Sequence, residues 1–415
     1  MTQASAASIA PSSKPQSNRR AMASTIVASL VALACGGAAN AAQTIKICSI
    51  DDRSGAAADT GIQGYNGLQI AVAEANAAGG IAGHKIEIVA YDGKTDPQLT
   101  ASYATRCAED DKGLLIIGGN PAAPAAAMIP VSGEYSLPYL MLSAGTDNLT
   151  DEPAPFHFRV GPRNSQDAAA IADLLAAQGF KRVAIANNSL PFGTDSALAS
   201  AAALEKKHIA IVSHQTYDIN ATDLAPQIAA IRNAKPDVVL VFPYAADGAR
   251  VLRTMKQLDL QVPTIVARSA LLETLRKLAG DASDGVMIPN TIDPNRADVK
   301  QYLATYTAKF GPVQPTMYPV LGYDAGKIAI QVISQTKVLE LLDKGDLPGA
   351  RKAFRDGMEA IGKFKGLQGR EGASYAFGPK HHHGSPDENW FTFIQVTDKG
   401  TRLVKPDTTA FKPKP

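Results

Sequence analysis

Apolar residues recur along positions 44–145 with two alternating periods. Runs in which every residue or every second residue is apolar predict β-strands, and stretches with apolar residues three or four positions apart predict α-helices. In the first helical stretch, Leu68, Val72 and Ala75 share one face. Because strands that alternate with helices form parallel sheets, we expect a parallel sheet with helices on both faces. The predicted elements are strands at 44–50, 85–91, 113–119 and 138–145, and a helix from residue 97 to about 111.

The same alternation begins again after residue 181 and predicts a second sheet. One of its helices carries Leu224, Ile228 and Ile231 on one face and is halted by Pro236. A chain of 415 residues is too long for one ordinary core, so two domains are expected. The fold class is therefore α/β with two doubly wound, parallel-sheet lobes. Further predicted strands are 182–187, 238–242 and 264–267, with a connection at 156–164 and a strand-like tail at 388–400 that has to join one of the two sheets.

The N-terminus has the order of a secretory signal. Arg19 and Arg20 precede the apolar residues 21–34, and small residues follow up to a cleavage motif at 39–41. We therefore expect residues 1–41 to be a signal peptide and the mature protein to be soluble in the periplasm. Three alternatives stay open: a membrane anchor, a twin-arginine signal and lipid attachment at Cys35.

Composition and motifs narrow the function further. The formal net charge is +2 and no dense basic block occurs, which argues against a nucleic acid partner. Cys48 and Cys107 could pair in an oxidising compartment, but their geometry decides this. No C-x-x-C, H-E-x-x-H or G-x-S-x-G motif is present, so we expect no enzyme, no metal and no cofactor. Residues 381–383, three histidines, are predicted to lie in a solvated loop, and Asp51 and Asp52 to be loop or surface charges.

Several segments together carry a family resemblance. "EANAAGGIAGHKIEIVAYD" followed by "KTDPQLTASYATR", then "LPYLMLSAGTDNLTD", "FHFRVGPRNSQDAAAIADLL", "TDLAPQIAAIRNAKPDVVLV" and "LAGDASDGVMIPN", occur in this order. The chain after the signal resembles the periplasmic solute-binding proteins of branched-chain amino acid ABC transporters, which have the type I two-lobe fold.

The resemblance implies a lobe made of residues 42–160 and 290–368 and a second made of 161–289 and 369–415. Crossing strands are implied near 157–162, 286–290 and 365–375. It also implies that a ligand binds in the cleft between hinged lobes and that the closed form docks on an ABC transporter permease. A diffusing receptor of this kind is expected to act as a monomer.

Candidate ligand-binding residues follow from the same resemblance. In the family, a ligand carboxylate is held by backbone N–H groups and small hydroxyls after two strands of the first lobe. The matching loops hold Ala122 and Ala123, and then the residues at 143–146. The alternative is that these loops are only helix caps and turns. The full set is Thr60, Ala122, Ala123, Ser143, Ala144, Gly145, Thr146, Phe192, Tyr244 and Arg268.

Three of these candidates lie in the predicted second lobe. Phe192 and Tyr244 match positions where aromatic side chains pack near the ligand, although either could simply fill the core. Arg268 matches the place where an acid pairs with the ligand's ammonium group. A guanidinium there would repel an ammonium and suits a carboxylate. We therefore expect a small organic anion, such as an aromatic acid, keto acid or dicarboxylate, or an amino acid-like compound. Alternatively, Arg268 pairs with a protein carboxylate such as Asp247 or Glu273.

The sequence thus predicts a solute receptor that feeds an ABC permease. The alternative is a sensory binding protein that reports ligand occupancy to a signalling partner. Both functions would use the same cleft.

Overall fold

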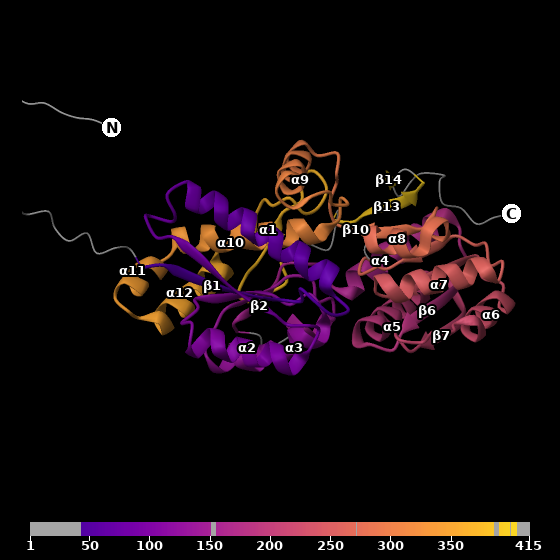
Figure 1. Cartoon of the computed structure of the whole chain (residues 1–415), viewed down its shortest axis with the longest axis horizontal. Coiled ribbons are helices and arrows are strands. Elements are labelled where there is room, and N and C mark those ends of the chain that lie inside the picture. The colour runs from indigo at the N-terminus through magenta and orange to yellow at the C-terminus, as the bar shows by residue number, and fades with distance from the viewer. Residues whose placement is uncertain (1–42, 151–154, 271, 386–389, 399, 405–415) are drawn as a thin grey trace, which may run out of the picture. The chain divides into compact units, whose positions relative to one another are not determined.

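A parallel sheet of five strands, which we call the first sheet, begins the fold (Figure 1). The computed structural model describes residues 43–150, 155–270, 272–385, 390–398 and 400–404, so the predicted signal peptide and Cys35 lie outside the described residues. The strand order is β2-β1-β3-β4-β5. The strands are β1 (Ile45–Asp51), β2 (Ile86–Asp92), β3 (Leu115–Gly118), β4 (Tyr139–Met141) and β5 (His157–Arg159).

Helices cover both faces of the first sheet, because neighbouring side chains of each strand point to opposite faces. Ile47 belongs to the hydrophobic cluster beneath α1 and α10, whereas Cys48 belongs to the cluster beneath α2 and α3. Figure 1 shows these two pairs of helices on opposite sides of β1 and β2. The helices are α1 (Ala58–Ala77), α2 (Pro97–Glu109), α3 (Ala122–Glu134) and α10 (Met317–Gln335).

Glycines allow α1 and α10 to pack with their backbones in contact. A Cβ atom at Gly67 would lie 2.0 Å from the carbonyl oxygen of Pro319, and one at Gly322 would lie 1.8 Å from that of Gly64. No side chain fits at such distances. Gly64 and Gly67 of α1 therefore serve the packing of α1 on α10.

The second sheet has seven strands in the order β14-β13-β10-β9-β8-β6-β7. Its central strands are parallel, and β13 and β14 are antiparallel additions beside β10. The predicted C-terminal tail thus joins the second sheet. The strands are β6 (Arg182–Asn188), β7 (Ala210–Tyr217), β8 (Val238–Phe242), β9 (Thr264–Val266), β10 (Met287–Asn290), β13 (Thr392–Thr397) and β14 (Gly400–Val404).

Both faces of the second sheet are also covered. Val183 and Val238 share a cluster with apolar residues of α4 and α5, and Ala184 and Val239 share one with apolar residues of α6 and α7. The helices are α4 (Asn164–Gln178), α5 (Pro191–Lys206), α6 (Ala225–Asn233), α7 (Ala245–Gln257) and α8 (Leu272–Ala279). The remaining elements are α9 (Ala297–Phe310), α11 (Val338–Asp343), α12 (Leu347–Ala360), β11 (Lys363–Phe364), β12 (Tyr375–Ala376) and the 3-10 helices at Asp147–Thr150 and Gly280–Ser283.

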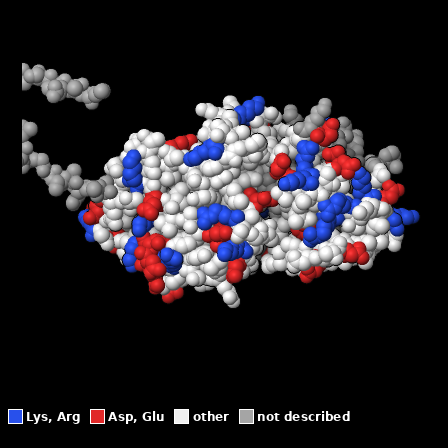
Figure 2. Space-filling view, viewed as in Figure 1, with Lys and Arg blue, Asp and Glu red and all other residues white. Residues whose placement is uncertain are grey.

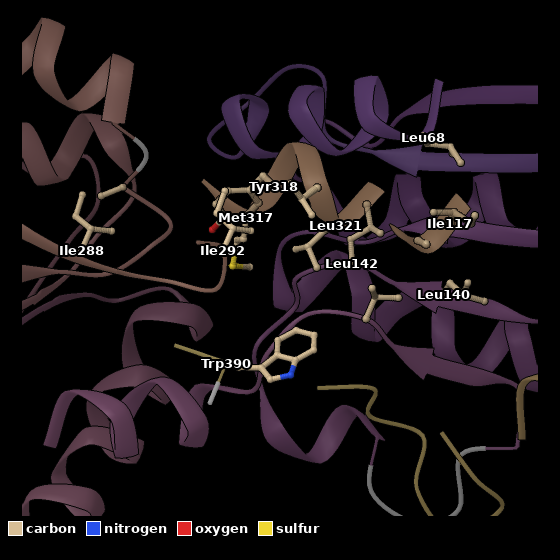
Figure 3. Packing of buried hydrophobic residues seen from close by; sticks show 14 of the residues in the cluster. Leu68, Ile117, Leu140, Leu142, Ile288, Ile292, Met317, Tyr318, Leu321 and Trp390 are labelled. Carbon is tan, nitrogen blue, oxygen red and sulfur yellow. The ribbon is translucent and has the colours of Figure 1, made fainter. Parts of the chain in front are cut away.

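The chain passes between the sheets after β5, after β10 and before β13. One hydrophobic cluster includes side chains from both sheets, and Figure 3 shows Ile292, Met317 and Tyr318 among its members. Ile292 also pairs with Gly369 in an isolated bridge, so two of the passing segments run together. The detailed bounds of the two lobes remain a prediction.

A disulfide joins β1 to α2. Cys48 and Cys107 are bonded, with 6.2 Å between their Cα atoms. Both side chains are fully buried in the cluster on the α2 and α3 face. The pairing that the sequence left open is therefore present.

Candidate functional site

The carboxyl ends of β3 and β4 lead into the two predicted first-lobe loops. Ala122 begins α3, which has no side-chain cap, so the first N–H groups of this helix lack acceptors within it. Ala144 is fully buried and its carbonyl oxygen accepts a hydrogen bond from Arg159. The carbonyl oxygen of Gly145 accepts a hydrogen bond from the backbone N–H of Asn164, at 2.7 Å. The loop after β4 is thereby tied to the start of α4.

The hydroxyl groups predicted to face a ligand all donate to protein acceptors. Ser143 donates to the amide oxygen of Asn120 at 2.9 Å, and Thr146 donates to Asp195 on α5 at 2.6 Å. Thr60 donates to the carbonyl oxygen of Ala57 within the first turn of α1. Backbone N–H groups are therefore the donors that these loops offer an anion, while Thr146 connects the loop after β4 to a helix of the second sheet.

Two aromatic candidates from the second sheet lie together. Phe192 stands in the first turn of α5, and Tyr244 precedes the first residue of α7. Their ring centroids are 5.8 Å apart, and each side chain is buried. Burial raises the pKa of Tyr244, with smaller contributions from Tyr318 and Asp52. A phenol from the second sheet therefore lies within electrostatic reach of an acid on the first.

Arg268 follows β9 and is 5% exposed. Its guanidinium forms an ion pair with Asp167 on α4 and donates to the carbonyl oxygen of Pro162 at 3.3 Å. A Cβ atom at Gly145 would lie 2.8 Å from Nη2 of Arg268, so the loop after β4 and this guanidinium are neighbours. Burial lowers the pKa of Arg268, and the electrostatic effects of Tyr318 and Asp147 oppose this. The structure thus places Arg268 against the loop after β4.

The partner of Arg268 differs from both carboxylates that the sequence suggested. Asp247 instead accepts hydrogen bonds from Asn188, from Tyr217 and from the backbone N–H of Tyr244. Asp167 was missed because it lies far from Arg268 in the sequence. The available signal was that Asp167 is an acid in the first turn of a helix and is followed by the apolar residues 168–172. The pairing changes the reasoning about the ligand, because a compensated guanidinium repels an ammonium group much less than a free one.

Asp51 and Asp52 were predicted to be loop or surface charges, and the surface part of this prediction is wrong, since their exposures are 2% and 1%. Asp51 is the last residue of β1, and Asp52 begins the loop that follows. β1 lies between β2 and β3, so neighbouring strands flank its carboxyl end. The backbone of Asp52 lies against Gly61 of α1. Burial raises the pKa of Asp51 to about 8, and the neighbouring Asp52 adds to the shift. Burial also raises the pKa of Asp52. Two acids that immediately follow a buried strand were the signal for such a site.

Asn120 connects the acid pair to the predicted ligand loop. Its amide nitrogen donates to Asp51 at 3.3 Å, and its amide oxygen accepts from Ser143. Sequence reasoning did not select Asn120. Its place directly after β3 explains how one side chain reaches both neighbouring strand ends.

One residue of the histidine loop differs from the expectation of a solvated loop. His382 is buried and its ring stacks on Phe158, with 4.1 Å between centroids. His382 Nε2 lies 3.3 Å from a carboxylate oxygen of Glu359. Within the described part of the chain, no group of three or more His, Cys, Asp or Glu side chains is arranged to hold a metal ion.

Other surface features lie away from these residues. A hollow of about 530 Å³ is lined by Pro263, Thr264 and Val286, among others, and by none of the predicted site residues. Acidic and basic side chains are interspersed on the face shown in Figure 2. None of the helices in the described ranges is both long enough and apolar enough to cross a membrane.

Comparison with known proteins identifies a family. The family model described as periplasmic binding protein matches residues 44–401. Leu/Ile/Val-binding protein homolog 7 of Brucella melitensis is 24% identical over 360 residues, which cover 80% of this chain and 89% of that protein. The Leu/Ile/Val-binding protein of Escherichia coli is 25% identical over 63% of this chain and 71% of its own length.

Solved structures agree with the fold. A type 1 periplasmic binding protein from Bordetella pertussis superposes with a TM-score of 0.77 and 26% identity, covering 87% of this chain and 99% of the other. The substrate binding protein LivJ of Streptococcus pneumoniae, solved in complex with isoleucine, gives a TM-score of 0.75 at 20% identity over 88% of this chain and all of that one. The chain therefore belongs to the periplasmic binding protein family and has the type I fold of that family.

Proposed function

We propose that the protein is an extracytoplasmic receptor that captures a small carboxylate-bearing solute and delivers it to an ABC transporter permease. The solute class includes aromatic acids, keto acids, dicarboxylates and amino acid-like compounds. The observation that carries the proposal is the contact between Arg268 and the loop after β4. This contact brings a guanidinium from the second sheet to backbone N–H groups of the first.

The chemistry of this contact suits a carboxylate. Arginine offers a planar set of donors that matches the two oxygens of a carboxylate, and α3 adds the uncapped N–H groups of its first turn. Asp167 holds the guanidinium in place and compensates its charge. Phe192 and Tyr244 supply apolar surface for the rest of the solute. The names of the relatives support an amino acid-like ligand and a transporter partner.

A thermal-shift panel tests the proposal. Leucine, isoleucine, benzoate, a 2-oxo acid and succinate are added singly to the purified protein. A true ligand at a hundredfold excess over its Kd stabilises the folded state by about 2.7 kcal/mol. We expect stabilisation by at least one carboxylate, and a loss of that stabilisation in Arg268→Met. Stabilisation by uncharged analogues such as amides, with no response to any carboxylate, would contradict the proposal.

We further propose that residues 1–41 are removed on export and that the two predicted lobes close around the ligand as a monomer. N-terminal sequencing of the exported protein tests the cleavage site. Small-angle scattering with and without a stabilising ligand tests both closure and the monomeric state. A mature N-terminus other than Ala42 would show that the signal is cleaved at a different bond. A radius of gyration unchanged by ligand would count against hinge closure.

A further inference from the structure

Asp51 and Asp52 form a buried acid pair at the carboxyl end of β1. Asp51 accepts hydrogen bonds from Ser49 and Asn120. Asp52 is 1% exposed. Thr95 donates hydrogen bonds to its carboxylate, but its Oδ2 atom has no hydrogen-bond partner. Among the residues that the structure describes, neither carboxylate forms an ion pair with a lysine or arginine. A buried carboxylate in this situation costs several kcal/mol unless a partner arrives.

A hydrogen-bonded side chain links the acid pair to the loop of the proposed carboxylate site. Asn120 joins Asp51 to Ser143 in the loop after β4. From the second sheet, Tyr244 lies close enough to Asp52 for this acid to contribute to the raised pKa of the phenol. The unpartnered oxygen therefore belongs to a buried acid beside the site.

The order of the strands sets the separation between the two charged places. β3 lies between β1 and β4, and neighbouring strands are spaced by about 4.8 Å, so the two strand ends lie about 10 Å apart. The α-ammonium of an amino acid is attached to the carbon next to its carboxylate. Such a group cannot reach the end of β1 while the carboxylate occupies the loop after β4. A cationic group several carbon atoms away can.

We propose that Asp52, supported by Asp51, binds a cationic group of the ligand, which makes the ligand a carboxylate with an amino or guanidino group at the far end of a short carbon chain. The carboxylate end of this assignment rests on the proposed function. Asp167 neutralises Arg268, whereas the acid pair has no such ion-pair partner among the described residues, so a cationic group of the ligand would take the place of the proton that burial otherwise favours there. Asp52 is then the residue that selects this solute class.

Matched ligand pairs test the inference. Isothermal titration compares 5-aminovalerate with valerate and lysine with norleucine on the purified exported protein. Within at least one pair, we expect the amino-bearing member to bind roughly tenfold tighter or more, which corresponds to about 1.4 kcal/mol. Asp52→Asn should remove this preference. Glu87→Gln, which removes an exposed carboxylate from the same sheet, should retain it.

The outcomes separate the inference from the proposed function. Equal binding within both pairs, or a preference that survives in a folded Asp52→Asn protein, overturns the role of Asp52. Binding of benzoate or a 2-oxo acid without any binding of the amino-bearing probes also overturns it, and leaves the proposed receptor function standing. If no carboxylate binds at all, both fail. If Asp52→Asn does not fold, the same titrations are made on Asp51→Asn. We then expect the preference for the amino-bearing ligand to become smaller, and an unchanged preference overturns the inference.

Discussion

The carboxyl edges of the two sheets differ in whether their buried charges have partners. On the second sheet, Arg268 is paired with Asp167, and Asp247 is surrounded by donors from Asn188 and Tyr217. On the first sheet, Asp51 and Asp52 are neighbours, and neither forms an ion pair with a lysine or arginine among the described residues. A charge that is neutralised in an ion pair, such as that of Arg268, can hold a hydrogen-bond donor in position, but it exerts little net electrostatic attraction on a ligand. A buried acid without a neutralising partner either stays protonated or binds a cation. Under the proposed function, the first sheet would select the charge of the ligand and the second sheet would position it.

Removing the disulfide should produce the largest effect, and it acts on the first sheet alone. Cys48 and Cys107 close a loop with a sequence separation of 59. By the chain-entropy model, such a cross-link contributes about 4 kcal/mol to the free energy of unfolding. We expect the double variant Cys48→Ala/Cys107→Ala to lose roughly this amount in urea denaturation. Treatment of the variant with reductant is the control and should change nothing. A wild-type protein whose stability is indifferent to reductant would contradict the prediction.

Breaking the ion pair on the second sheet should cost slightly less. Asp167→Ala leaves the guanidinium of Arg268 buried without its carboxylate, and such a loss typically costs about 3 kcal/mol or more. The double variant Asp167→Leu/Arg268→Met removes both charges and should recover most of that stability. Denaturation curves of the three proteins give the coupling energy. Equal destabilisation in the single and double variants would show that the ion pair is not the cause.

The acid pair on the first sheet should respond to pH. The folded-state pKa of Asp51 is about 8, above the usual carboxyl value of 3.8, so the folded protein binds an extra proton between these pH values. The protonated Asp51 contributes fully to the free energy of unfolding below about pH 4, and this contribution is lost as the pH rises through about 8. Asp51→Asn cannot lose a proton. We therefore expect this variant to gain roughly 2 kcal/mol relative to wild type between pH 4.5 and pH 8.

Denaturation at the two pH values measures this gain, with Glu87→Gln as the control that removes an exposed carboxylate. If the free energies of unfolding of wild type and Asp51→Asn change with pH in parallel, Asp51 does not titrate in this range.

The smallest effect concerns the hydrogen bond that links the two edges. Thr146 donates to Asp195, and a bond of this kind to a charged acceptor contributes about 1–2 kcal/mol. Thr146→Val keeps the shape and removes the donor. We expect weaker binding of any stabilising carboxylate, by roughly fivefold to tenfold, because the bond joins the two predicted lobes, and a loss of stability without ligand no larger than the contribution of this one bond. Thr105→Val, on a helix remote from this edge, is the matched control. Unchanged affinity would exclude a role for this bond in ligand capture.

Much of the fold was predictable from local sequence. The strand at 182–187 and the helix beginning at residue 97 agree closely with β6 and α2, because hydrophobic period and helix-start signals depend on neighbouring residues. Arg268 was recognised as a candidate because a charge directly after a strand is visible in the sequence. The apolar pattern alone did not decide the position of the C-terminal tail, since it fits the edge of either sheet, and only the family resemblance assigned the tail to the second lobe.

The sequence by itself determined the order of elements, the two parallel sheets and the residues that stand at the strand ends. Only the tertiary structure decided that Arg268 meets Asp167, that Cys48 meets Cys107 and that Asp52 is buried. The physical reason is range: a strand or helix is specified by residues a few positions apart. The charge state and partner of a side chain depend on which distant segments fold against it.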